Sequence, residues 1–396
     1  MRQGQTDRPP LKAAAWAPVV AIGLSTFAVV TTEMLPVGLL TPMAASLGTS
    51  VGAAGLAIFL PALLAGLVAP LVLVASGGID RRRILIGLLG LLAVANMAAA
   101  AASSIGWLLA ARVLVGFCMG GVWAVAGGLA PRLVPEQQQG LATAVIFGGV
   151  AAASVFGVPI GVLIADLGGW RVSFGVMAAF SGLVLALNIL TLPPLPVAES
   201  VRPSQFVALL AQPPVRAGLI IILLLVAGHF MAYTFVQPML EVLAEGPVRW
   251  TGLLLFAYGA AGLAGNFVAG PMAALRPSGT LALIAGGLAS ALLAFPLLGS
   301  TPAGAALVLV FWGFAYGGAS VALQTWMMRA APHAAEVATS LFVAAFNLAI
   351  ALGAFMGGRF VDQLNLHANT LVAACLPLAA LGFMFAVRSS RARNAR

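Results

Sequence analysis

Long apolar stretches, each about the length needed to cross a bilayer, recur from one end of the chain to the other. A transmembrane helix needs about 20 mainly apolar residues, and Gly, Pro and charged residues mark where these stretches end. With 62% hydrophobic and only 7% charged residues, the chain has too few ions to cover a soluble globule. We predict an all-α integral membrane protein with twelve transmembrane helices over 14–40, 51–75, 84–102, 107–130, 139–164, 172–192, 217–240, 251–272, 280–299, 304–328, 337–361 and 369–387.

The longest polar break in the sequence separates these spans into two sets of six. We predict an N-terminal six-helix bundle over 1–192 and a C-terminal six-helix bundle with a basic cytoplasmic tail over 217–396. The cytoplasmic linker between them, 193–216, contains a possible short amphipathic piece around 206–210.

The two halves also repeat in sequence. A shift of 196 residues places Asp166 on Asp362 and Gly157 on Gly353. Parallel six-span repeats are typical of transporters in which two halves rock around a central site. The repeat therefore favours a pseudo-symmetric transporter.

Positive charge is strongly biased between alternate loops. With a cytoplasmic N-terminus, fifteen of the 19 Lys and Arg residues fall on the cytoplasmic side, and only Arg171, Arg249 and Arg359 fall on the other. The positive-inside rule then places both termini in the cytoplasm. The membrane we expect is a bacterial-type inner membrane. The net charge of +9 thus reflects topology; we expect no nucleic-acid partner, because that requires basic residues gathered on one face. The fifteen residues are Arg2, Arg8, Lys12, Arg81, Arg82, Arg83, Arg132, Arg202, Arg216, Arg276, Arg329, Arg388, Arg391, Arg393 and Arg396.

Several classes of protein are disfavoured by what the sequence lacks. Cys118 and Cys375 both fall in apolar runs, which gives no disulfide framework and no CxxC metal site. Lys12 is the only lysine and has no Walker A context. The spans contain no nucleophile–base pair or metal cluster that an intramembrane enzyme needs. The first apolar run is too long for a cleaved signal peptide, and eleven more follow it. We expect no enzymatic activity, no metal and no cofactor, with energy drawn from a proton gradient.

The clearest functional candidates are two charges inside spans. Glu33 lies about 8 residues, or ~12 Å, from the outer end of its span, and Arg112 lies about 6 residues, or ~9 Å, from the outer end of its own. Charges in a bilayer interior are costly and usually face a cavity or a partner. We predict that Glu33 carries the proton and that Arg112 modulates it. The alternative is a permanent structural ion pair, which is also costly to break.

Five short motifs occur in order along the spans. They are TEMLPVGLLTP (32–42), SGGIDRRR (76–83), RVLVGFCMGG (112–121), GVPIG (157–161) and GHFMAYTFVQPML (228–240). Through these motifs the chain resembles the major facilitator superfamily, specifically its twelve-span drug:H⁺ antiporter branch and the sugar-, arabinose- and purine-efflux-type permeases. The loop motif is a degenerate copy, since Ser76 replaces its leading Gly. The resemblance implies alternating access and a monomer in the lipid bilayer.

The resemblance also keeps several polar or aromatic residues as candidates for the substrate cavity. His229, Tyr233 and Gln237 are spaced by four residues and so share one helix face. For the lone His, a packed, hydrogen-bonded core residue is the main alternative. Tyr258 and Tyr316 are expected in the core or facing lipid rather than in the site. The remaining cavity candidates are Asn347, Gln324 and Trp123.

A second group of residues is predicted to act in conformational change. Asp80 and Arg81 can form a charge-assisted latch between spans 2 and 3. A plain positive-inside signal is the alternative for the arginine, but it does not require Asp80. Gly157, Pro159 and Gly161 remove side-chain bulk and one backbone donor, which allows close helix packing and a bend. Static packing is the alternative role for these three.

Taken together, the sequence predicts a proton-coupled secondary transporter that exports a small organic solute. An importer or uniporter of the same fold is the alternative, and a membrane scaffold or sensor is less favoured because it leaves Glu33 and the repeat without a purpose. A single membrane carboxylate favours neutral or weakly polar substrates over dicationic ones. The motifs do not distinguish drugs, sugars and nucleosides.

Overall fold

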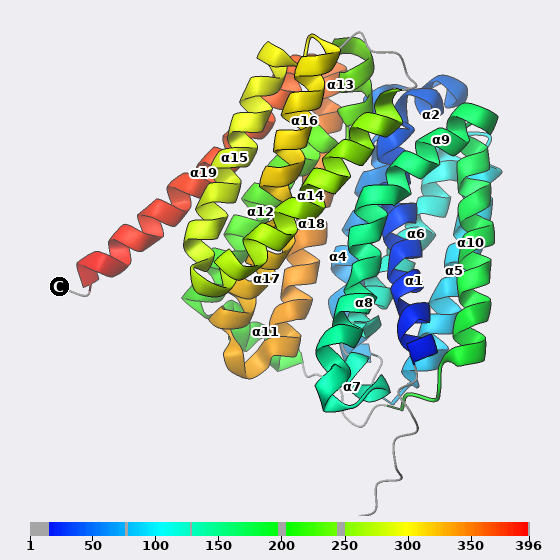
Figure 1. Cartoon of the computed structure of the whole chain (residues 1–396), viewed down its shortest axis with the longest axis vertical. Helices are drawn as coiled ribbons and strands as arrows, with labels where there is room; N and C mark the ends of the chain where they lie inside the picture. The colour runs from blue at the N-terminus through cyan, green and yellow to red at the C-terminus, as the bar shows by residue number, and fades with distance from the viewer. Residues whose placement is uncertain (1–15, 76–77, 127–128, 197–202, 244–249, 395–396) are drawn as a thin grey trace, which may run out of the picture.

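A computed structural model describes residues 16–75, 78–126, 129–196, 203–243 and 250–394. These residues form helices and no strand, and twelve of the helical segments are long and apolar enough to cross a membrane. Figure 1 shows the two halves side by side, with the early helices in one bundle and the late helices in the other. The all-helical prediction of twelve spans in two six-helix bundles is confirmed.

The N-terminal bundle holds the first six spans, several of them assembled from more than one helical segment. Its elements are α1 (Trp16–Met34), η1 (Leu35–Gly38), α2 (Leu40–Leu47), α3 (Val51–Ala54), α4 (Leu56–Ala75), α5 (Arg81–Ala100), α6 (Ile105–Ala126), α7 (Ala130–Leu133), η2 (Glu136–Gln138), α8 (Gln139–Ala152), η3 (Ala153–Gly157), α9 (Val158–Gly168) and α10 (Trp170–Thr191).

The C-terminal bundle holds the last six spans, and a short helix, α11 (Pro203–Leu210), precedes it where the sequence suggested an amphipathic piece. The first helix of this bundle begins at Pro213, inside the segment expected to be linker. Its elements are α12 (Pro213–Tyr233), α13 (Val236–Leu243), α14 (Thr251–Leu275), α15 (Pro277–Leu298), α16 (Pro302–Gly317), α17 (Ala319–Ala330), η5 (Pro332–Ala334), α18 (Ala335–Gln363) and α19 (Leu366–Asn394).

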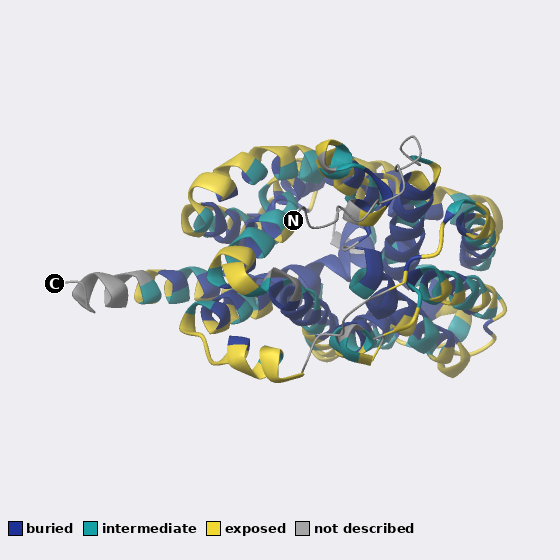
Figure 2. Ribbon diagram, turned by 90° about the horizontal axis from the view of Figure 1, so that it is seen from below, coloured by how far each residue is buried: buried dark blue, intermediate teal, exposed yellow. Residues whose placement is uncertain are grey.

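The helices bury one side within the molecule and leave large apolar side chains on the perimeter. Leu167, Leu190 and Leu275 are each more than four-fifths exposed, and Figure 2 shows buried residues concentrated toward the inside of both halves. A perimeter of this kind is stable in hydrocarbon rather than in water. It is what a multi-pass membrane protein requires.

The first, fifth and tenth spans each contain a break where the sequence removes a backbone donor or a side chain. The first span changes from α1 to the 3₁₀ turn η1 at Pro36. The fifth contains a π-helical turn, η3, just before Pro159. The tenth breaks at Gly318, between α16 and α17. Such breaks mark places where a membrane helix departs from regular hydrogen bonding, and they often lie at functional sites.

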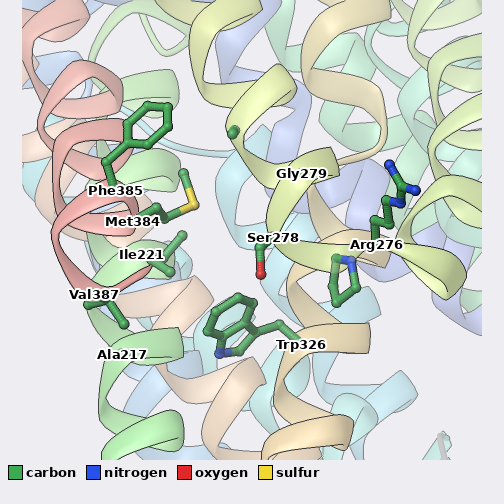
Figure 3. A pocket seen from close by; sticks show the side chains of 11 residues that line it. Ala217, Ile221, Arg276, Ser278, Gly279, Trp326, Met384, Phe385 and Val387 are labelled. Atoms are coloured by element: carbon green, nitrogen blue, oxygen red, sulfur yellow. The ribbon is translucent and has the colours of Figure 1, made fainter. Parts of the chain in front are cut away.

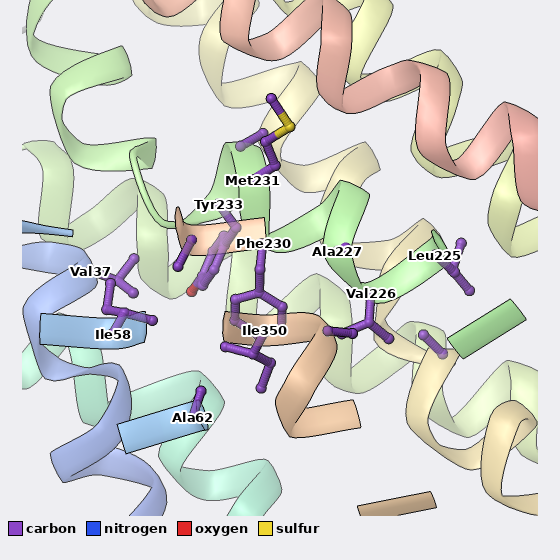
Figure 4. Packing of buried hydrophobic residues seen from close by; sticks show 14 of the residues in the cluster. Val37, Ile58, Ala62, Leu225, Val226, Ala227, Phe230, Met231, Tyr233 and Ile350 are labelled. Carbon is purple, nitrogen blue, oxygen red and sulfur yellow. The ribbon is translucent and has the colours of Figure 1, made fainter. Parts of the chain in front are cut away.

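A shared apolar core joins the two bundles. Val37, Ile58 and Ala62 of the N-terminal bundle belong to the same buried cluster as Tyr233 and Ile350 of the C-terminal bundle, and Figure 4 shows these side chains facing one another. Because apolar contact is not directional, this interface holds the bundles together without fixing their angle.

Hydrogen bonds between the bundles gather at the end of the molecule that carries α2 and α13, here called the α2 end (top of Figure 1). Thr41 N donates to Gln237 Oε1 at 3.3 Å. Ser50 Oγ donates to Asp362 Oδ2 at 2.6 Å, and Gly52 N donates to Asp362 Oδ1 at 2.9 Å. The two bundles are therefore tied together at the α2 end, which the charge bias predicts to face outside.

Asp80 and Arg81 lie at the opposite end, which carries α7. Asp80 caps α5, because its Oδ1 accepts from Arg82 N at 2.8 Å, and it also accepts from Leu195 N at 2.9 Å. Arg81 N donates to Leu195 O at 3.1 Å. These bonds tie the loop before α5 to the segment after α10 within one bundle. A role in gating stays a prediction for both residues.

Several residues named in the sequence analysis lie outside the described residues. They are Ser76, Arg2, Arg8, Lys12, Arg202, Arg249 and Arg396.

Candidate functional site

Glu33 lies in the last turn of α1, just before the Pro36 break. Its side chain is 2% exposed, and its Oε1 atom has no hydrogen-bond partner. An unpartnered carboxylate oxygen in a membrane interior is costly as an anion. The site thus contains a buried carboxyl group, and no hydrogen bond stabilises its Oε1 atom.

Arg112 lies on α6 at the same depth and is fully buried. Its guanidinium donates to three backbone carbonyls: Nε to Ala57 O at 2.7 Å, Nη1 to Thr32 O at 2.7 Å and Nη2 to Glu33 O at 2.8 Å. The predicted proximity of Arg112 and Glu33 is therefore present, but the hydrogen bond joins the guanidinium to the Glu33 backbone. The roles of the two residues in coupling stay predictions.

A buried aromatic cluster occupies the C-terminal bundle. His229 and Tyr316 stack face to face with ring centroids 3.4 Å apart and planes 5° apart. Tyr233 stacks on the His229 ring at 5.0 Å and on Tyr258 at 4.8 Å, and Trp312 meets His229 edge-on at 5.7 Å. The chain contains three tyrosines, and all three lie in this cluster. We call these five residues the His229 cluster.

The polar edges of the His229 cluster are partly joined by hydrogen bonds. Trp312 Nε1 donates to His229 Nδ1 at 3.1 Å, and Tyr258 Oη lies 3.5 Å from His229 Nε2. The buried Tyr316 hydroxyl has no partner. Because an indole N–H can only donate, His229 Nδ1 must be an acceptor, and a neutral ring then carries its proton on Nε2. This arrangement fixes the tautomer and leaves one hydroxyl for a further polar contact.

Close packing of two glycine-rich helices brings the cluster together. A Cβ on Gly317 would lie 2.0 Å from Gly262 O, and one on Gly313 would lie 2.2 Å from Tyr258 O. Small residues at such contacts let membrane helices approach backbone to backbone. The glycines of α14 and α16 therefore set Tyr258 beside Trp312 and Tyr316. The sequence expectation of core or lipid-facing positions for Tyr258 and Tyr316 did not anticipate their convergence on His229.

The other predicted cavity residues are distributed elsewhere. Gln237 leaves the face of His229 and Tyr233 and instead bonds Thr41 across the bundles and Glu241. Asn347 Nδ2 donates to Val343 O at 2.8 Å, and its buried Oδ1 has no partner. Gln324 is half-buried on α17.

Trp123, the last cavity candidate, is half-buried on α6. It stacks on Phe147 of α8 with ring centroids 6.0 Å apart. The structure therefore joins only His229 and Tyr233 of the six candidates into one cluster.

Gly157, Pro159 and Gly161 lie where the fifth span packs against the first. A Cβ on Gly157 would lie 2.5 Å from Thr31 Oγ1, and one on Gly161 would lie 2.1 Å from Leu35 Cδ1. The glycines thus allow close packing within the N-terminal bundle, beside the π turn. A gating role for these residues stays a prediction.

A separate cavity of about 670 Å³ lies among α12, α15, α17 and α19 (Figure 3). Ile221, Trp326, Met384 and Arg276 are among its lining residues. None of the predicted site residues lines this cavity, and it lies apart from both Glu33 and the His229 cluster. Among the described residues there is also no group of three or more His, Cys, Asp or Glu residues placed to hold a metal ion.

Two six-helix bundles with buried polar sites between apolar surfaces define a membrane transporter rather than an enzyme. The profile of the Major Facilitator Superfamily matches residues 22–354. The chain therefore belongs to the Major Facilitator Superfamily.

Relatives of similar length match almost the whole chain. The "Purine ribonucleoside efflux pump NepI" of Salmonella enteritidis PT4 is 34% identical over 365 residues, which cover 92% of this chain and 91% of that protein. The "Transcription regulatory protein OpdE" of Pseudomonas aeruginosa is 32% identical over 375 residues, covering 94% and 93%. The resemblance to efflux permeases, inferred from the sequence motifs, therefore agrees with the name of the first of these relatives.

Solved structures agree on the fold. A bacterial homologue of the human lysosomal transporter Spinster, in an inward-facing and occupied conformation, superposes with a TM-score of 0.75 at 15% identity, covering 96% of this chain and 98% of that one. The human organic anion transporter MFSD10 superposes with a TM-score of 0.64 at 18% identity, covering 95% and 100%. At these identities the likeness concerns architecture alone.

Proposed function

We propose that this transporter exports a planar heteroaromatic solute of the purine ribonucleoside type, in exchange for protons carried by Glu33. The observation that carries the substrate class is the His229 cluster. It combines stacked rings with polar edges, and one of its hydroxyls has no partner. Relatives named as purine ribonucleoside efflux pumps support the same class.

The chemistry of the cluster suits a nucleobase. Stacking of a base on an aromatic side chain contributes about 1–3 kcal/mol per base, and aromatic pairs prefer stacked or edge-on geometry. His229 and the tyrosines also supply donors and acceptors at the ring edges. A sugar alone uses the hydrogen bonds but not the stacking, so the cluster favours a base-containing solute.

Glu33 suits the proton-carrying role because of its setting. Its carboxyl is buried in a membrane span next to a helix break, and its Oε1 has no partner. A buried carboxyl exchanges a proton when a change of conformation alters its access to water. With the termini in the cytoplasm, the α2 end faces outside, and the bonds joining the bundles there close the outer side.

The test is substrate-triggered proton flux in proteoliposomes. The panel comprises inosine, guanosine, adenosine, cytidine and arabinose, with wild type compared with Glu33→Gln. We expect purine nucleosides to trigger flux in wild type and not in the variant, while the exposed control Asp166→Asn behaves like wild type. Flux triggered by arabinose but not by nucleosides would overturn the substrate class. Concentrative export by Glu33→Gln with unchanged pH dependence would remove Glu33 from coupling.

A further inference from the structure

We infer that Arg112 is a positioning residue that satisfies backbone carbonyls left without donors by two prolines, Pro36 and Pro61. It joins the end of α1 to α4 beside Pro61 and fixes the backbone of Glu33. Its donors are used on carbonyls, so the Glu33 carboxyl has no hydrogen bond from Arg112 and can take up a proton. The structural part of this inference stands by itself, and its consequence for coupling rests on the proposed function.

The first carbonyl is freed by Pro36. In a regular α-helix the carbonyl of residue i accepts from the N–H of residue i+4, and the partner of Thr32 O would be the nitrogen of residue 36. Proline has no N–H, so Thr32 O lacks its helical donor. Arg112 Nη1 supplies one at 2.7 Å. Arg112 Nη2 donates to the next carbonyl, Glu33 O, at 2.8 Å.

The second carbonyl is freed in the same way on a different helix. Pro61 lies inside α4, and the residue four positions earlier is Ala57. Arg112 Nε donates to Ala57 O at 2.7 Å. Gly116, one turn beyond Arg112 on α6, makes the approach possible, because a Cβ there would lie 2.8 Å from Pro61 O. Arg112 and Gly116, the Arg and the first Gly of the span 4 motif, therefore both pack against the stretch of α4 around Pro61.

Only an arginine fits this arrangement. Its donors form a rigid planar fork, whereas a lysine is a point charge with one nitrogen. Three charge-assisted bonds from one side chain join α1 and α4 to α6. In a membrane interior, where no water satisfies a carbonyl, each unmade bond is costly. Arg112 therefore donates its hydrogen bonds to backbone carbonyls rather than to a carboxylate.

A thermal-unfolding cycle in lipid nanodiscs tests the inference. Arg112→Met is made in the wild type and in a Pro36→Ala/Pro61→Ala background, where alanine restores both N–H donors. We expect Arg112→Met to lower the unfolding midpoint clearly more in the wild type, with roughly half of the loss recovered in the alanine background. The matched control background is Pro70→Ala alone, which changes another proline of α4, restores neither donor and should give no recovery.

Equal losses in both backgrounds would overturn the inference, and this outcome does not depend on transport or on the identity of the substrate. A second measurement separates positioning from charge. Arg112→Lys keeps a positive charge but not the fork, so we expect it to lose proton-coupled export. The triple Arg112→Met/Pro36→Ala/Pro61→Ala variant should regain part of that export with the wild-type pH midpoint. Wild-type export by Arg112→Lys would show that charge suffices and overturn the positioning role.

Discussion

The two bundles have different buried chemistry although they share one architecture. Among the described residues, the buried ionic side chains Glu33, Arg81 and Arg112 all belong to the N-terminal bundle. The C-terminal bundle instead buries the His229 cluster, with every tyrosine of the chain. A duplicated fold has therefore placed charge on one side of the bundle interface and aromatic rings on the other.

This difference suggests a division of labour between the halves. A buried acid responds to protons but has little selectivity for an organic solute, whereas stacked rings recognise a planar solute and need carry no net charge. If the proposed function holds, variants in the N-terminal bundle should alter coupling, and variants in the C-terminal bundle should alter substrate preference. The following predictions test how far the two can be separated.

The largest effect is expected where the His229 cluster depends on helix packing. Gly317→Ala places a Cβ 2.0 Å from the Gly262 carbonyl oxygen and forces α14 and α16 apart. We expect a loss of about 3 kcal/mol in unfolding free energy, at the upper end for overpacking, together with loss of nucleoside preference. Thermal unfolding and competition transport measure the two. Gly286→Ala is the matched control, because a Cβ there meets nothing within 4 Å; equal effects of the two variants would contradict the packing argument.

A smaller effect is expected from removing the hydrogen-bond acceptor inside the cluster. His229→Phe keeps a ring for stacking but leaves the buried Trp312 N–H without its acceptor. We expect a loss of about 1–3 kcal/mol in stability and roughly tenfold weaker apparent nucleoside affinity, with proton stoichiometry unchanged.

The control for this prediction is the double variant His229→Phe/Trp312→Phe. Because the unpaired Trp312 N–H is then removed, part of the lost stability should return even though the smaller ring leaves a cavity, while nucleoside affinity stays weak. Altered proton stoichiometry in His229→Phe would show that the C-terminal bundle also carries protons and would break the division of labour.

The sequence predicts the spans well because hydropathy is a local property. It also places Glu33 and Arg112 at the same depth, since rise per residue is fixed within a helix. It does not show that Arg112 bonds Ala57 and Thr32, because backbone carbonyls have no signature in residue type. The sequence does contain one signal. Pro36 and Pro61 lie four residues after Thr32 and Ala57, so each proline marks a carbonyl without its helical donor.

The His229 cluster was only half predictable for a related reason. His229 and Tyr233 share a face of one helix, so spacing alone relates them. Tyr258 and Tyr316 join them from two other helices, and the rotation of one helix against another is set by glycine contacts such as Gly313 with Tyr258. In an apolar span with a weak amphipathic pattern, sequence does not tell which face turns inward.

The smallest effect is expected at the α2 end, where the bundles meet outside both buried sites. Asp362 of the C-terminal bundle accepts two hydrogen bonds across the interface, from Ser50 Oγ and from Gly52 N. A Cβ on Gly52 would lie 2.4 Å from the Asp362 carboxyl, so the contact requires glycine there. Asp362→Asn removes the charge that strengthens both bonds, at a cost of about 1 kcal/mol.

This cost should appear as a shift between conformations rather than as unfolding. We expect a roughly fivefold rise in the population open at the α2 end, measured as longer distances between spin labels at Leu167 and Leu364, which are 91% and 61% exposed. Asp166→Asn, at the equivalent position of the other half, is the control and should leave the distances unchanged. An unchanged distribution in Asp362→Asn would mean that apolar packing alone holds the α2 end closed. In that case the two halves would differ only in their buried chemistry and not in how they are held together.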